Sequence, residues 1–144
     1  MRIKPFIIIL VAAFCFNNVY AQRSRIKPFD SDVLVGNWTG TWNGDTTGKF
    51  VMKITKDSEG KLSGRINASS DTGEAFDIYF EPTVAKGNKI TAKFEDPFDE
   101  REVSIEALLE GSTLKGAYTI RQKGRGRKLE DGKLKATKSD PRPL

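Results

Sequence analysis

The 144-residue sequence predicts an all-β protein, built as a single antiparallel up-and-down (meander) barrel of eight strands, with a β-sandwich as the alternative architecture. Apolar and polar residues alternate in nearly every segment, and apolar spacing of the helical kind is absent over any useful length. Short turn-forming stretches such as 43–48 and 57–60 separate these segments, which predicts antiparallel pairing of consecutive strands. Closure into a barrel is favoured because it removes the exposed edges of an open meander.

Eight segments are expected to form strands, and each presents one apolar face. They cover residues 35–42, 49–56, 61–69, 76–80, 90–94, 103–107, 114–120 and 134–136. Pro82 follows the fourth segment and has no N–H to donate to a ladder, so we expect it at a bulge or at an edge.

The first segment contains both tryptophans of the chain, in the stretch GNWTGTW. Trp38 and Trp42 have the same parity, with Gly40 midway between them, so both indoles are expected to point into the barrel. Gly40 would leave room where another wall approaches, and Gly64 and Gly116 have the inward parity for the same role.

The chain divides into four expected regions. Residues 1–21 read as a secretory signal peptide, because basic residues precede a short apolar run that ends in small residues. Cleavage after Ala21 would leave an N-terminal lead over 22–32, the barrel over 33–138 and a disordered tail over 139–144. The protein is therefore expected to be secreted or periplasmic in a bacterium.

One motif resembles a known family. The stretch FDSDVLVGNW, residues 29–38, is similar to the first signature of lipocalins, in which Phe-Asp is followed after five residues by Gly-x-Trp. In that family the Trp seals the closed end of an eight-stranded barrel and a basic residue from a late strand packs over it. The resemblance implies that Trp38 closes the barrel, with Arg121 as its packing partner.

The wider layout resembles small secreted bacterial lipocalin-like (calycin-type) domains and, more weakly, avidins. Avidins line their biotin site with tryptophans from later strands, and this chain has none after Trp42. Biotin is therefore not the expected ligand.

The composition argues against catalysis. Histidine is absent from the whole chain and the single cysteine, Cys15, lies in the expected signal peptide, so the usual neutral-pH base, thiol nucleophile and zinc ligands are lacking. The expected interior has no ionisable side chain. We therefore expect no enzyme activity, no cofactor and no metal. The acidic residues within 95–102 could offer oxygens to calcium, but their spacing matches no EF-hand and a solvated loop is preferred.

The expected interior is apolar and aromatic. Its lining residues are Trp38, Trp42, Phe50, Met52, Phe76, Phe80, Phe94 and Tyr118. Eight strands enclose either a filled core or a cup for one small ligand. The predicted function is binding of a small hydrophobic molecule or acyl chain by a monomer, through a cup open at the end away from Trp38. The alternative is a structural or partner-binding module with a fully packed core.

The C-terminal part is basic, with nine basic and three acidic residues over 121–144. Its loop carries Lys123, Arg125, Arg127 and Lys128, which predict a charged hairpin or a weak contact with an anionic envelope surface. No aromatic stacking platform accompanies these charges, so nucleic acid is not an expected partner.

Overall fold

The computed structural model describes residues 29–84, 87–96 and 100–139. The expected signal peptide and the end of the expected tail, residues 140–144, lie outside the described residues. The expected lead is described only from Phe29 onward. No helix in the described part of the chain is long and apolar enough to cross a membrane.

The described chain consists of one short 3-10 helix, η1 (Ser31–Leu34), followed by strands. The strands are β1 (Gly36–Asn43), β2 (Thr47–Lys56), β3 (Leu62–Ser70), β4 (Ala75–Phe80), β5 (Thr83–Val84), β6 (Lys89–Glu95), β7 (Arg101–Glu110), β8 (Thr113–Gln122) and β9 (Lys128–Ser139). Exposed and less exposed residues alternate along most of these strands, which is the period-2 pattern that the sequence predicted.

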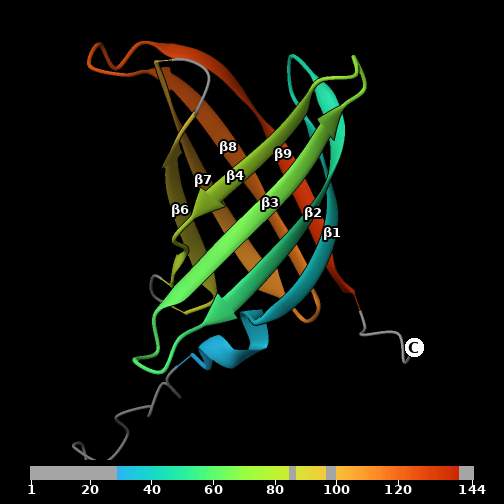
Figure 1. Ribbon diagram of the computed structural model, residues 1–144, viewed down its shortest axis with the longest axis vertical. Coiled ribbons are helices and arrows are strands. Elements are labelled where there is room, and N and C mark those ends of the chain that lie inside the picture. Colours follow the sequence, from blue (N-terminus) through green and yellow to red (C-terminus); the bar gives the residue numbers. More distant parts are fainter. Residues whose placement is uncertain (1–28, 85–86, 97–99, 140–144) are drawn as a thin grey trace, which may run out of the picture.

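The strands form one curled antiparallel sheet in the order β4-β3-β2-β1-β9-β8-β7-β6-β5 (Figure 1). The first and last long strands pair with each other, with Gly40 opposite Ala136 and Trp42 opposite Leu134. This pairing rolls the meander into a barrel and confirms the barrel over the sandwich. The fold class is thus as predicted, although the strand count is nine instead of eight.

The additional strand is β5, which pairs with β6 through Thr83 and Val84. It begins just after Pro82, which cannot donate to the ladder of β4, so the chain leaves β3 and resumes pairing on β6. As a result β4 and β5 are the two ends of the hydrogen-bonded order. Across this seam the rings of Phe80 in β4 and Phe94 in β6 face each other, with centroids 6.4 Å apart.

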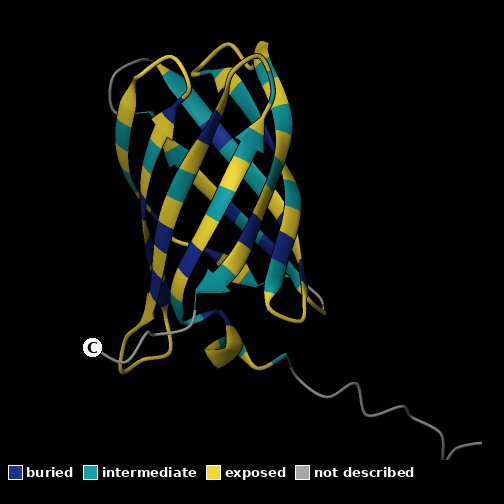
Figure 2. Ribbon diagram, turned by 90° about the vertical axis from the view of Figure 1, so that its right-hand side faces the viewer, coloured by how far each residue is buried: buried dark blue, intermediate teal, exposed yellow. Residues whose placement is uncertain are grey.

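The half of the barrel next to η1, which we call the closed end, is packed. Trp38, Leu34 and Ile54 are its largest fully buried side chains. The indole Nε1 of Trp38 donates a hydrogen bond of 2.9 Å to the carbonyl oxygen of Leu34, which ties η1 under the barrel. Figure 2 shows η1 lying beneath this end, with buried and exposed positions alternating along the strands above it. The opposite end carries the β1–β2, β3–β4 and β8–β9 turns, and we call it the open end.

Candidate functional site: a cavity at the open end

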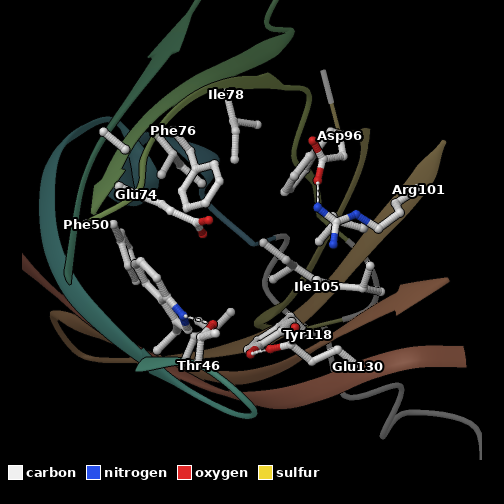
Figure 3. A pocket seen from close by; sticks show the side chains of 18 residues that line it. Thr46, Phe50, Glu74, Phe76, Ile78, Asp96, Arg101, Ile105, Tyr118 and Glu130 are labelled. Atoms are coloured by element: carbon white, nitrogen blue, oxygen red, sulfur yellow. Dashed lines mark hydrogen bonds and ion pairs between the residues drawn. The ribbon is translucent and has the colours of Figure 1, made fainter. Parts of the chain in front are cut away.

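The half of the barrel toward the open end is hollow, with a cavity of about 580 Å³ (Figure 3). Its wall comes from every long strand of the barrel and is mostly apolar. The lining residues are Trp42, Thr46, Phe50, Ile66, Ala68, Glu74, Ala75, Phe76, Ile78, Phe94, Asp96, Arg101, Val103, Ile105, Tyr118, Ile120, Glu130 and Leu134. The barrel is therefore packed at one end and hollow at the other. The predicted filled core describes the closed half, and the predicted cup describes the open half.

Glycines keep this half hollow. Trp42 lies directly opposite Gly48 in the β1–β2 ladder, and Phe50 lies opposite Gly40 in the same ladder. A methyl group at position 48 would fall 2.2 Å from Cη2 of Trp42, and one at position 40 would fall 2.4 Å from Cζ of Phe50. Each ring therefore lies against the backbone of the opposite glycine, where a side chain would otherwise stand. The predicted role of Gly40 is confirmed, and the rings cover the wall without filling the cavity.

Tyr118 also lies against a glycine on the neighbouring strand. This residue is opposite Gly132 in the β8–β9 ladder, and a methyl group at Gly132 would lie 2.5 Å from its Cε1. The phenol O–H donates to Oε1 of Glu130 at 2.5 Å. Burial, this hydrogen bond and the negative charges of Glu130, Asp45 and Asp131 raise the pKa of Tyr118 above its ordinary value of 10.0. Tyr118 is therefore a neutral phenol throughout the physiological range.

The raised pKa of Tyr118 predicts a loss of stability in alkali. A folded-state pKa above the unfolded value contributes stability that is complete below about pH 10 and is lost as the pH rises toward the folded value. Between about pH 9 and about pH 11 the free energy of unfolding should fall more steeply in the wild type than in Tyr118→Phe. Subtracting the absorbance titration of Tyr118→Phe from that of the wild type isolates the phenolate of Tyr118. This phenolate should appear only at a pH above 10.0. Ionisation of Tyr118 at an ordinary tyrosine pKa would contradict the buried hydrogen bond.

A second polar pair lies at the mouth of the cavity. Nη2 of Arg101, at the start of β7, is 2.8 Å from Oδ2 of Asp96, which follows β6. Glu74, from the β3–β4 turn, points its carboxylate into the cavity. These side chains and Glu130 correct the prediction of an interior without ionisable groups. They lie just outside the apolar segments expected from the sequence, yet each has the inward parity of its strand, so alternation extended to the strand ends would have indicated them.

The predicted lining residues separate by their depth in the barrel. Trp42, Phe50, Phe76, Phe94 and Tyr118 line the cavity as predicted. Trp38, Met52 and Phe80 instead belong to the packed core of the closed end. All eight have the inward parity, but parity does not specify the height of a residue along the barrel axis.

The structure corrects the packing partner of Trp38. Arg121 lies at the end of β8, where its guanidinium donates to the carbonyl oxygen of Gly126. Lys138 is the register partner of Trp38 in the β1–β9 ladder, and its Nζ lies 5.8 Å from the centroid of the indole ring. The same Nζ donates to the carbonyl oxygen of Val33 at 2.8 Å. The lipocalin resemblance therefore implied the correct arrangement, but we assigned it to the wrong residue.

The basic hairpin lies at the open end and is only partly available to a partner. Lys123 pairs with Glu95 at 2.8 Å and Lys128 pairs with Asp131 at 2.8 Å. Arg125 and Arg127 are exposed, and neither side chain forms an ion pair with any described residue. The predicted contact of these four residues with an anionic surface remains a prediction.

The acidic segment before β7 is paired with cations. Besides the ion pairs of Glu95 and Asp96, Glu102 lies 3.8 Å from Nζ of Lys93. Asp99 lies outside the described residues. Within the described ranges no group of three or more acidic, histidine or cysteine side chains is arranged to hold a metal ion.

Comparison with solved structures shows that the fold is similar to that of other β-barrels. EF1p2_mFAP2b bound to DFHBI matches with a TM-score of 0.63 at 12% identity, over 76% of this chain and 96% of that chain. The redesigned β-barrel mFAP1 bound to DFHBI matches with a TM-score of 0.59 at 17% identity, over 72% and 95%. The S-type phycobiliprotein lyase CPES from Guillardia theta matches with a TM-score of 0.54 at 12% identity, over 78% and 91%. At these identities the likeness is one of fold. No family model and no curated protein matches the sequence.

Proposed function

We propose that this protein is a non-catalytic, lipocalin-like binding protein that holds a small hydrophobic molecule in the cavity at the open end. The observation that carries the proposal is the hollow half-barrel of about 580 Å³ above a fully packed closed end. Ligand pockets in proteins commonly enclose about 300–1,000 Å³ and are lined mainly by apolar and aromatic side chains with a few polar groups. Two barrels of similar fold bind DFHBI, which supports the same use of the cavity here.

The polar groups of the cavity favour recognition over catalysis. Arg101 is held by Asp96, and Tyr118 is held by Glu130. The pKa of Tyr118 is raised by burial, away from the value near neutrality that a general base needs. We therefore assign these side chains to the orientation of a bound molecule. The proposal includes export to the periplasm or the cell exterior, on the signal-like pattern of residues 1–21.

Binding in the cavity can be tested with a neutral apolar dye whose fluorescence rises in a nonpolar site, such as N-phenyl-1-naphthylamine. The wild-type protein should give a saturable rise. Ile105, on β7, lines the cavity. Ile105→Trp should lower the affinity for the dye by about tenfold or more, because the larger ring occupies the ligand volume.

The same strand provides a matched control. Leu108 points outward from β7 and is 46% exposed, so Leu108→Trp adds an indole to the outer face without touching the cavity. Its dye affinity should equal that of the wild type. Equal affinity of all three proteins would mean that the dye binds elsewhere and would refute the proposal. Absence of binding to the wild type would favour the packed-module alternative.

A further inference from the structure

We propose that the cavity selects apolar molecules that carry a cationic head group, such as an alkylammonium, over those with a neutral or anionic head. This inference rests on the proposed function and names the ligand class of the same site. It follows from an imbalance among the described residues that line the cavity, where carboxylates outnumber cations.

Among the described residues, three carboxylates and one guanidinium line the cavity. The guanidinium of Arg101 is matched by Asp96, whose side chain is only 12% exposed. The carboxylates of Glu74 and Glu130 form no ion pair with any residue of the described chain. They approach the cavity from different sides, Glu74 from the β3–β4 turn and Glu130 from β9 (Figure 3). The lining therefore carries two negative charges without a cationic partner.

The two carboxylates without a cationic partner also leave hydrogen-bond acceptors in the lining. The indole Nε1 of Trp42 donates to the hydroxyl oxygen of Thr46 at 3.5 Å, and the phenol of Tyr118 donates to Oε1 of Glu130. Both of these donors are thus engaged within the wall. Oε2 of Glu130 and both oxygens of Glu74 remain as acceptors, which a donor head group of a ligand can satisfy and a carboxylate head cannot.

Negative charges also lie near Tyr118. Burial is the main cause of the raised pKa of its phenol, and the carboxylates of Glu130, Asp45 and Asp131 raise that pKa further because each opposes a second negative charge. A ligand carboxylate near Tyr118 would meet the same repulsion, whereas an ammonium would be attracted. A fatty acid is consequently a poor fit, although the apolar wall would accept its chain.

The test compares three molecules with the same chain and different heads: octylammonium, octanol and octanoate. Each is titrated against the bound neutral dye at pH 7 and low salt. Octylammonium should displace the dye at about a tenfold lower concentration than octanol, and octanoate should be the weakest. Added salt should lower the affinity for octylammonium and leave the affinity for octanol unchanged, because screening acts only on the charged head.

Two variants locate the effect. Glu130→Gln and Glu74→Gln should each reduce the affinity for octylammonium by about five- to tenfold more than they reduce the affinity for octanol. Glu74 is exposed in a turn, so its substitution should not disturb folding. Glu59→Gln is the matched control, because it removes the same charge from the β2–β3 turn at the closed end and should have no effect.

The outcomes separate this inference from the proposed function. If octanol or octanoate displaces the dye as well as octylammonium does, the head-group preference is wrong while the cavity remains a binding site. If Glu59→Gln lowers the affinity for octylammonium as much as Glu74→Gln and Glu130→Gln do, the attraction comes from the overall charge and the inference is also wrong. If the dye does not bind the wild type at all, the proposed function fails first.

Discussion

Trp38→Ala is expected to lower the free energy of unfolding by about 3–5 kcal/mol, because a large, fully buried ring leaves a void that the surrounding wall cannot close. The substitution also removes the hydrogen bond from Nε1 to Leu34 and the contact of the ring with Lys138. A domain of this size has a total stability of about 5–15 kcal/mol, so the substitution should remove a large part of it. Denaturant unfolding followed by circular dichroism measures the difference.

Trp42→Ala is the matched comparison, since it removes the same side chain from the same strand. Trp42 is half-buried in the cavity wall, so its loss should destabilise the fold less and weaken dye binding more. Trp38→Ala should instead destabilise the fold more, and the protein that remains folded should lose less of its affinity for the dye. Equal destabilisation by both substitutions would contradict the division of the barrel into a packed end and a hollow end.

Gly48→Ala is expected to destabilise the protein by about 1–3 kcal/mol and to weaken dye binding, although alanine is the smallest possible addition. The backbone at position 48 is in an ordinary conformation, so the conflict is purely steric. The added methyl would lie 2.2 Å from Cη2 of Trp42 and 2.4 Å from the carbonyl oxygen of Ser69. Relief requires the indole to swing into the cavity, which takes up the ligand volume. Chemical denaturation and the dye titration measure the two effects.

A double-mutant cycle with Trp42→Ala distinguishes this cause from a general loss of glycine flexibility. In the Trp42→Ala background the ring contacts are gone while the contact with Ser69 remains, so Gly48→Ala should lower the free energy of unfolding by less. The expected coupling between the two sites is about 0.5–3 kcal/mol. Strictly additive effects would show that Trp42 does not rest on Gly48.

The apolar side of the site could be predicted from the sequence, but its depth could not. Phe76 and Phe80 are four residues apart on one strand and share the inward parity, yet Phe76 lines the cavity and Phe80 packs the closed end. Alternation tells which side of the sheet a residue faces, because successive side chains point to opposite faces. It does not tell how far along the barrel axis the residue lies.

Strand register decides which charged residues meet at the cavity. It also decides which basic residue packs over Trp38. Lys138 has the same parity as Ala136, so its inward position could have been noticed, but only the β1–β9 pairing places it opposite Trp38. Arg101 and Glu130 come from strand ends, and their approach to one cavity depends on the pairing of β7 with β8 and of β8 with β9. Both residues have the inward parity of their strands, which indicates the side of the sheet that they face but not that they meet at one cavity.

By itself the sequence determined an all-β meander, its turns, the inward parity of its rings and the glycines that stand among them, since each of these follows from residues close together in the chain. Only the tertiary structure decided that the barrel is hollow at one end. A cavity exists here because Gly48, Gly40 and Gly132 stand directly opposite Trp42, Phe50 and Tyr118. That opposition is a property of strand register, which joins residues by hydrogen bonds between strands and not by their order in the chain.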